Sequence, residues 1–325
     1  MNFNQEHLSR NLGLDLVRVT EAAALAAGRW MGFGDTESAD RAAAEAMAGA
    51  MTTMDINGVI AICEDSNTNP NTLLATGQKV GTGTGEALDV VLDPIDGVRI
   101  LAMSNSDAIS VIAATPRGTI CPLYPAHYME KIIVDHEAAA ALVPECIDAP
   151  AAWTLALVAR VKDKPVRDLV VFVLDRPRHQ DLIHEIRSAG ARVILRSDGD
   201  VAGALATLTK ARADLVMGTG GVPEGLMTAC AVKSLGGAML CRLAPQSVEE
   251  RARILEAGLD TRKIYSCDDL VNGDEIFFAA TGITDGAVLS GVHYQGNHAH
   301  TESLVLRCQT SSRRIIQTSH RLFDH

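Results

Sequence analysis

The sequence predicts an α/β protein with an α+β first lobe and an α/β second lobe. Hydrophobic residues make up 47% of the 325 residues and aromatic residues only 4%, a composition typical of α/β enzymes and unlike that of disordered chains. This length suffices for two domains that share a core, and strand-like runs alternate with helical patterns in the second half. We therefore expect a lobe with a mixed sheet over residues 1–160 and an α/β lobe over residues 161–325, whose last strands pack back on the first lobe.

The first lobe begins with two helical patterns. Apolar residues recur at helical spacing over residues 12–30 and over the alanine-rich residues 37–51, and a Gly-Phe-Gly-Asp segment at residues 32–35 interrupts the pattern. The apolar run at residues 59–63 predicts a strand, and the polar residues 64–72 without periodicity predict a loop. Further predicted strands of this lobe are residues 88–92, 109–114 and 132–134.

The second lobe has a more regular pattern. Residues 135–164 contain two prolines and are expected to form the crossing between the lobes. Apolar runs then alternate with helical segments, which predicts a mostly parallel sheet with right-handed crossovers. The predicted strands are residues 169–174, 193–195 and 215–217, and the predicted helices are residues 179–189, 201–208 and 224–235. Residues 303–307 and 314–317 indicate two final strands joined by a short turn.

Charge and composition exclude several classes of function. A formal net charge of -11 leaves no surplus of Lys and Arg to neutralise a nucleic-acid backbone, although a small anionic ligand remains compatible if cations mediate its binding. The N-terminus is polar, and no stretch approaches the roughly 20 apolar residues that span a bilayer. The seven cysteines lack zinc-ligand spacing. We therefore expect a cytoplasmic protein with a small-molecule ligand and no nucleic-acid or membrane partner.

The segment Asp93-Pro94-Ile95-Asp96-Gly97 is the most informative stretch of the chain. Proline disfavours the helical conformation at Asp93 and fixes its own backbone, so that both carboxylates can face one pocket. Two carboxylates and a backbone carbonyl suit Mg²⁺ or Mn²⁺, which prefer oxygen ligands. Taken alone, an Asp-Pro turn with Asp96 capping a helix is the commoner explanation.

Six segments together resemble the motifs of one family in the same order. They are Gly32-x-Gly34-Asp35, Asp93-Pro94-Ile95-Asp96-Gly97, Tyr128-Met129-Glu130-Lys131, Asp175-Arg176-Pro177-Arg178-His179, Asp198-Gly199-Asp200-Val201 and Gly218-Thr219-Gly220-Gly221-Val222-Pro223-Glu224-Gly225. On these segments the chain resembles the class II fructose-1,6-bisphosphatases, the bacterial GlpX-type enzymes of the lithium-sensitive sugar-phosphatase fold. The resemblance implies a layered αβαβα architecture, a homo-oligomer, and metal-dependent hydrolysis of fructose 1,6-bisphosphate or a related ketose or cyclitol phosphate.

The resemblance also implies a set of metal ligands. Mg²⁺ or Mn²⁺ would draw an anionic phosphomonoester and an anionic hydroxide together. The corresponding residues are Asp35, Asp65, Asp93, Asp96 and Glu224, with Asp65 and Asp96 as the catalytic residues. From the residues alone, Asp35 could instead cap the helix that follows it, and Glu224 could complement a helix dipole after Pro223.

Other matched positions fall where the family binds the sugar and its distal phosphate. Arginine offers a bidentate fork to phosphate, aspartates accept hydrogen bonds from sugar hydroxyls, and glycine amides bind anions. These substrate-binding residues are Tyr128, Lys131, Arg178, Asp198, Asp200 and Gly221. His179, a lone histidine at a helix start, is expected to be structural.

The resemblance fails at the positions that activate water. Where the family carries Gly-Glu-Gly-Glu after the strand at residue 59, this chain has residues 64–72 with a different sequence. In the gapless register Asp65 takes the metal-ligand position and Asn69 replaces an acidic residue, whereas a one-residue slip would offer Glu64. Val98 stands where the family has Thr or Ser, and neither Val98 nor a neutral Asn69 accepts a proton effectively.

Two lesser departures accompany these. Thr36 replaces a family Lys, and Asp107 replaces a family Asn.

Two hypotheses of different class follow from these differences. The first is an active phosphatase in which metals alone activate water, and the second is a ligand-binding or regulatory paralogue that keeps the sugar-phosphate pocket without hydrolysis. A third is a changed reaction, such as a lyase or phosphate-transfer step on a ketose phosphate.

Overall fold

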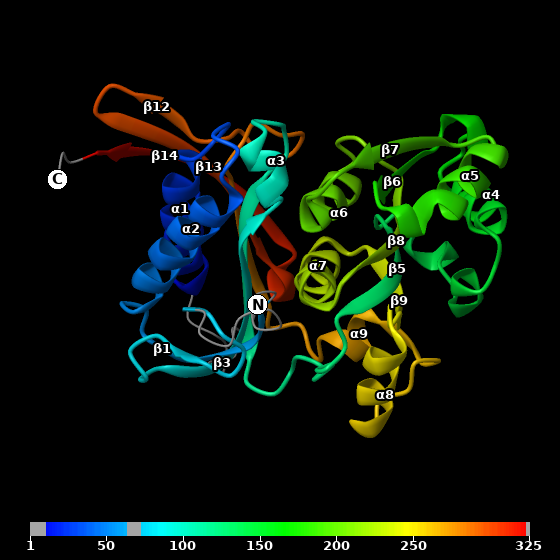
Figure 1. Cartoon of the computed structure of the whole chain (residues 1–325), viewed down its shortest axis with the longest axis horizontal. Helices are drawn as coiled ribbons and strands as arrows, with labels where there is room; N and C mark the ends of the chain where they lie inside the picture. Colours follow the sequence, from blue (N-terminus) through cyan, green and yellow to red (C-terminus); the bar gives the residue numbers. More distant parts are fainter. Residues whose placement is uncertain (1–10, 64–72, 323–325) are drawn as a thin grey trace.

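Helical and sheet layers alternate through the protein in the order αβαβα. The computed structural model describes residues 11–63 and 73–322. In Figure 1, α1 (Leu12–Gly28) and α2 (Thr36–Met51) form the outer helical layer on the first sheet, while α6 (Asp200–Leu208) and α7 (Val222–Leu235) lie between the two sheets. The remaining outer layer is formed by α4 (Ala151–Val161) and α5 (Gln180–Ser188). The layered architecture expected from the sequence is therefore confirmed.

The first sheet combines strands from both ends of the chain. Its order is β12-β13-β11-β4-β3-β1-β2, with β14 paired to β13. These strands are β1 (Ile56–Cys63), β2 (Lys79–Val80), β3 (Glu86–Asp96), β4 (Ile109–Pro116), β11 (Phe277–Gly282), β12 (His293–Gln295), β13 (His298–Arg307) and β14 (Ser312–Arg321). β1 and β3 are parallel, and the other pairs are antiparallel.

The second sheet is less parallel than its sequence pattern predicts. Its order is β10-β9-β5-β8-β6-β7. The strands are β5 (Tyr128–Val134), β6 (Val170–Leu174), β7 (Arg192–Arg196), β8 (Leu215–Gly221), β9 (Ala238–Leu243) and β10 (Ile264–Ser266). Only β6 pairs in parallel, with β7 and β8, because β5 inserts between β8 and β9 antiparallel to both. The prediction of a mostly parallel sheet is wrong here, since the spacing of later strands contains no information about an earlier strand that joins them.

The chain crosses between the sheets twice. It leaves the first sheet after β4, enters the second with β5, and returns to the first with β11. The predicted division between residues 160 and 161 falls at the end of α4, a helix on the outer face of the second sheet. Short helices complete the connections, namely α3 (Val98–Ala102), α8 (Val248–Glu256) and α9 (Cys267–Leu270).

Helix α7 is buried on all sides because both sheets pack against it. Eleven of its residues are buried, and seven of them belong to the hydrophobic core that also contains inward-facing residues of β4, β5, β8 and β11. A helix that is apolar all round is expected in such a central layer. Two further cores lie under α1 and α2 and under α4 and α5. In the described part of the chain, no helix has the length and apolar character needed to cross a membrane.

Lys162 joins the outer helical layer to the second sheet through buried charges. Its side chain is 3% exposed, and its Nζ lies 2.6 Å from Oδ2 of Asp135 and 3.5 Å from Oδ1 of Asp214. Replacing Lys162 with methionine is expected to lower the free energy of unfolding by about 3–5 kcal/mol, because the buried Asp135 loses this cation and Asp214 loses one of its two. Lys164, which is 45% exposed, also contacts Asp214, and Lys164→Met should cost no more than about 1 kcal/mol. Urea denaturation measures both, and equal costs would contradict the burial argument.

Candidate active site

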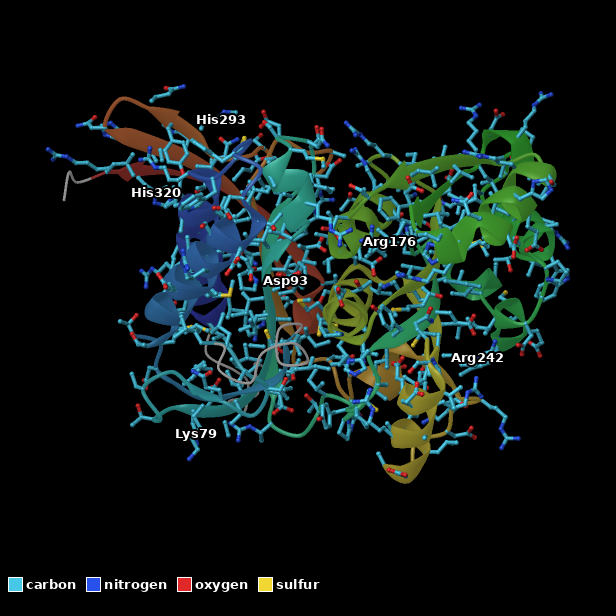
Figure 2. The ribbon with its side chains drawn as sticks, in the orientation of Figure 1. Lys79, Asp93, Arg176, Arg242, His293 and His320 are labelled. Atoms are coloured by element: carbon cyan, nitrogen blue, oxygen red, sulfur yellow. The ribbon has the colours of Figure 1, made fainter. Side chains whose placement is uncertain are left out.

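A cavity of about 470 Å³ opens between the two halves of the protein, the first built on the sheet that contains β3 and the second on the sheet that contains β5. It lies where the carboxyl ends of β3, β6, β7 and β8 converge, so that residues distant in the sequence meet there. In Figure 2, Asp93 lies in the first half and Arg176 in the second. The polar side chains that line the cavity are Asp93, Asp96, Arg99, His127, Tyr128, Arg176, Arg178, Asp198, Asp200 and Glu224.

The segment from Asp93 to Gly97 brings two buried carboxylates to the cavity. The pairing of β3 with β4 is irregular between Asp93 and Asp96, and Oδ1 of Asp93 accepts a hydrogen bond from the Ile95 amide at 2.9 Å. Gly97 then adopts a left-handed conformation, which glycine tolerates best, and α3 begins at the next residue. Asp96 does not cap α3. Its Oδ2 accepts from the Ala202 amide in the first turn of α6 at 2.8 Å, which links the two halves.

Glu224 lies in the first turn of α7, and its side chain occupies space left free by the glycine just before the helix. Its Oε2 is buried and has no hydrogen-bond partner among the described residues. A Cβ at Gly221 would lie 2.0 Å from that oxygen, and a Cβ at Gly220 would lie 2.0 Å from Oδ2 of Asp200. Side chains at these glycines would displace both carboxylates, so the glycines make room for an acidic site.

The carboxylates disturb one another electrostatically. Burial raises the pKa of Asp96 well above its ordinary value, and Asp198, Asp200 and Glu224 raise this pKa further against the opposing hydrogen bond from Ala202. Burial also raises the pKa of Glu224, and the charge of Asp200 adds to the effect. Negative charge is therefore concentrated beyond what the protein neutralises, which is a property of cation-binding and catalytic sites.

Two arginines also line the cavity. The guanidinium of Arg178 donates through Nη2 to the Thr219 carbonyl at 2.8 Å and lies 5.3 Å from the ring centroid of Tyr128. Arg176 donates to the Ser197 carbonyl and lies 3.4 Å from Oδ1 of Asp198. These contacts hold two cations at fixed positions on the wall.

Arg99 is a third cation at this cavity. It is exposed at the start of α3, and its backbone N–H donates to Oδ2 of Asp198 at 3.4 Å. The cavity thus carries both carboxylates and arginines. We call the mutually repelling carboxylates around Asp96 and Glu224 its carboxylate end. This combination suits a ligand whose anionic groups bind both metal ions and arginines.

Comparisons with known proteins agree with this arrangement. The family model described as bacterial fructose-1,6-bisphosphatase, glpX-encoded, matches residues 10–320. The chain belongs to this family. It is similar to the fructose-1,6-bisphosphatase class 2 of Haemophilus influenzae, with 38% identity over 98% of both chains. It is also similar to fructose-1,6-bisphosphatase 1 class 2 of Escherichia coli strain K12, with 36% identity over 97% of this chain and 96% of the relative.

Several residues that the glpX resemblance implied do come together. Eight of them line this cavity, namely Asp93, Asp96, Tyr128, Arg178, Asp198, Asp200, Gly221 and Glu224. Lys131 is 2% exposed and pairs with Asp200, so it supports a lining residue from behind. Within the described residues, no three His, Cys, Asp or Glu side chains are arranged closely enough to hold a metal ion together.

Two of the expected metal ligands are not seen at the cavity. Asp35 is exposed, and its Oδ1 accepts from the Ser38 amide at 2.9 Å as the N-cap of α2, which is the alternative that the sequence left open. This hydrogen bond lowers the pKa of Asp35. Asp65, its alternative Glu64, and Asn69 lie outside the described residues. The ligand roles of Asp35 and Asp65 remain proposals from family membership.

Sequence reasoning did not assign Arg99, Arg176 or His127 to the site. Arg176 lay inside a recognised motif, His127 directly precedes another, and Arg99 lies two residues after a third. A usable signal existed for Arg176, which follows the predicted strand at residues 169–174, since ligand sites in α/β folds gather at carboxyl ends of strands.

His179 serves the structure around the cavity, as its sequence context indicated. It is 3% exposed, and its Nδ1 lies 2.7 Å from the Leu174 carbonyl while its Nε2 accepts from the Thr219 amide at 2.8 Å. These partners specify a neutral ring with the proton on Nδ1. Burial lowers the pKa of His179 and so favours the same neutral form.

Replacing His179 with leucine is expected to cost about 1–3 kcal/mol of unfolding free energy at pH 7.5, because the Thr219 amide loses its acceptor. The cost should shrink as the pH falls below 6.5, the ordinary pKa of histidine. In that range the unfolded wild type gains a proton that the folded form resists, so the wild type loses the stability that the neutral ring provides. Urea denaturation at pH 7.5 and 5.5 measures this. The exposed His184 provides the control, and an equal effect of His184→Leu would contradict the assignment.

Proposed function

We propose that this protein is a metal-dependent phosphatase that hydrolyses a phosphomonoester of a sugar bisphosphate. Fructose 1,6-bisphosphate is the first candidate substrate, and related ketose or cyclitol phosphates are the others. The observation that carries the proposal is a cavity lined by both buried carboxylates and arginines, in a chain that matches the glpX family over residues 10–320. Both named relatives are fructose-1,6-bisphosphatases.

The carboxylate end has the chemistry that a hard divalent cation requires. The buried Oε2 of Glu224 has no described hydrogen-bond partner, and the mutual repulsion of Asp96, Asp200 and Glu224 calls for positive charge. Oxygen ligands of this kind suit Mg²⁺ or Mn²⁺. Asp93, Asp96 and Glu224 would supply ligands to the ion together with the proposed Asp35 and Asp65, because the described residues do not by themselves place three such side chains around one ion. When bound, such an ion supplies charge neutralisation for the phosphoryl group and lowers the pKa of bound water.

The remaining side chains would bind and orient the substrate. Arg176 and Arg178 offer guanidinium groups to the phosphate that is not transferred, and the ring of Tyr128 packs beside Arg178. Asp198 and Asp200 are placed to accept hydrogen bonds from sugar hydroxyls. Holding both ends of the substrate presents its reacting phosphate to the carboxylate end in a fixed orientation.

Proton transfer is the step in which this chain departs from the family pattern. Val98 lines the cavity directly after Gly97 and offers no hydroxyl. Water activation in this protein would therefore depend on the bound metal and on carboxylates such as Asp96 and the proposed Asp65. We infer that hydrolysis persists at a lower rate than a hydroxyl at position 98 would permit.

Phosphate release by the purified protein tests the proposal. The assay compares fructose 1,6-bisphosphate with sugar monophosphates and other bisphosphates, each with Mg²⁺, with Mn²⁺ and with excess chelator. We expect metal-dependent release that is fastest with a bisphosphate. A rise in thermal stability with the same ligands but no release from any of them would instead identify a sugar-phosphate-binding paralogue.

A further inference from the structure

The loop that precedes β4 contacts the substrate-binding turn of the other half of the protein. This turn, residues 197–200, joins β7 to α6 and carries Asp198 and Asp200. Asp198 lines two cavities, the active site and a smaller one of about 20 Å³. The smaller cavity has room for about one water molecule and is too small for a metabolite. Its polar groups therefore interact with one another rather than with a ligand.

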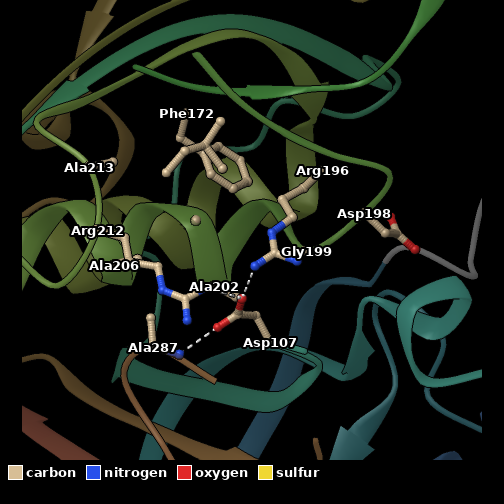
Figure 3. A pocket seen from close by; sticks show the side chains of 12 residues that line it. Asp107, Phe172, Arg196, Asp198, Gly199, Ala202, Ala206, Arg212, Ala213 and Ala287 are labelled. Atoms are coloured by element: carbon tan, nitrogen blue, oxygen red, sulfur yellow. Dashed lines mark hydrogen bonds and ion pairs between the residues drawn. The ribbon is translucent and has the colours of Figure 1, made fainter. Parts of the chain in front are cut away.

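Asp107 occupies the centre of the charged contacts at the smaller cavity. Its Oδ2 lies 2.5 Å from Nη2 of Arg196, the last residue of β7, and 3.7 Å from Nη1 of Arg212. Its Oδ1 accepts from the Ala287 amide at 2.6 Å. Figure 3 shows this carboxylate between the Arg196 guanidinium and the Ala287 backbone. One carboxylate therefore joins β7 of the second sheet to two loops of the first half.

The backbone of this loop is shaped for that contact. Asp107 has a φ of 80°, a left-handed conformation that costs a residue with a side chain about 1 kcal/mol or more. A Cβ at Gly286 would lie 2.7 Å from Oδ1 of Asp107, so the neighbouring loop makes room for the carboxylate. The protein thus holds the Asp107 side chain in one position at an energetic cost.

The turn itself packs directly on the first half. A Cβ at Gly199 would lie 3.3 Å from Cδ1 of Ile100 and 3.6 Å from the carbonyl oxygen of Asp107. The Arg99 amide approaches Asp198 at only 3.4 Å, a long hydrogen bond. The charged contact between Asp107 and Arg196 is the shorter attachment between the two halves at this turn, at 2.5 Å.

We infer that Asp107 is a positioning residue for substrate binding. By holding Arg196, its carboxylate fixes the turn that carries Asp198 and Asp200 relative to Asp93 and Asp96 across the cavity. This role rests on the proposed function, because it concerns the same substrate site. Asp107 itself does not line the active-site cavity and takes no part in bond breaking.

Two substitutions at Asp107 separate its contacts. Asp107→Ala removes the contact with Arg196 and the contact with the Ala287 amide. Asp107→Asn keeps an oxygen for the Ala287 amide and removes only the charge that binds Arg196. We expect Asp107→Ala to raise KM for fructose 1,6-bisphosphate about tenfold and to change kcat less than about threefold, because the lost contacts hold ground state and transition state alike. Asp107→Asn should raise KM about threefold. Combining Asp107→Asn with Arg196→Ala should add nothing to Arg196→Ala alone, because Asp107→Asn removes only the charged contact.

Hydrogen–deuterium exchange gives a readout that needs no substrate. Amides of residues 197–202 should exchange faster in Asp107→Ala than in the wild type, whereas β1 should be unchanged. If Asp107→Ala lowers the free energy of unfolding but leaves KM and the exchange at the turn unchanged, Asp107 only stabilises the fold and the inference is overturned. Additive effects on KM in the double variant would also overturn it. If the wild type releases no phosphate, the proposed function fails. The exchange measurement then still tests whether Asp107 positions the turn: faster exchange of residues 197–202 in Asp107→Ala supports this, and unchanged exchange contradicts it.

Discussion

Replacing Glu224 with glutamine is expected to lower kcat/KM by about 10³-fold. Glutamine keeps the size of the side chain but removes the negative charge that a divalent cation requires, and stabilisation of phosphoryl charge by such a cation is worth several kcal/mol. Asp93→Asn, on the same wall of the cavity, should have a comparable effect. Steady-state phosphate release measures both, and Glu130→Gln on β5 is a matched control outside the active-site lining that should stay within about twofold of the wild type.

The Glu224→Gln variant should also separate metal binding from folding. Without added metal it should be at least as stable as the wild type, because the neutral amide removes a buried charge and its repulsion by Asp200, the two causes that raise the pKa of Glu224. The rise in thermal stability that Mn²⁺ gives the wild type should disappear. A variant that unfolds more easily in the absence of metal, yet keeps its stabilisation by Mn²⁺, would contradict the metal-ligand role.

Introducing a hydroxyl at position 98 is expected to accelerate the reaction. Val98→Thr combined with Asn69→Asp should raise kcat about 10²-fold, the lower limit of what a positioned proton acceptor usually contributes. Val98 lines the cavity and is partly buried, so threonine of nearly equal size can be accommodated there. Phosphate release at saturating substrate is the measurement, and Val98→Ile serves as a control without a hydroxyl.

The same experiment distinguishes an active enzyme from a paralogue that only binds. Measurable release by the wild type with a gain in the double variant supports the proposed phosphatase. Release by the double variant alone would identify the natural protein as a sugar-phosphate binder. Equal rates for Val98→Thr/Asn69→Asp and the wild type would mean that the metal alone governs water activation here.

Much of the fold followed from local patterns. The apolar runs at residues 169–174 and 215–217 correspond to β6 and β8, and the helical pattern at residues 224–235 corresponds to α7. These elements were predictable because β6 and β8 contain short continuous apolar runs and α7 is a longer apolar segment, the patterns expected of buried strands and a buried helix. The position of β5 between β8 and β9 was not predictable in this way, since it depends on pairing between segments about 80 residues or more apart.

The candidate site was predictable where residue type and backbone geometry coincide. The proline and glycine around Asp93 and Asp96 indicated a turn after a strand, and the structure places both carboxylates at the cavity. For Asp35 the sequence could not distinguish two roles, because an aspartate before a helix is suited both to capping that helix and to binding a metal. The interaction of Asp107 with Arg196 could not be inferred either, since it joins residues 89 positions apart through a tertiary contact.

The most direct test of the phosphatase assignment follows metal binding and catalysis in one sample. Mn²⁺ is titrated into the purified wild-type protein with fructose 1,6-bisphosphate while electron paramagnetic resonance measures bound Mn²⁺ and a colorimetric assay measures phosphate. We predict that phosphate release rises in proportion to bound Mn²⁺, and that Glu224→Gln loses both together. Release that is independent of bound Mn²⁺, or full Mn²⁺ binding with no release from any sugar phosphate, would contradict the assignment.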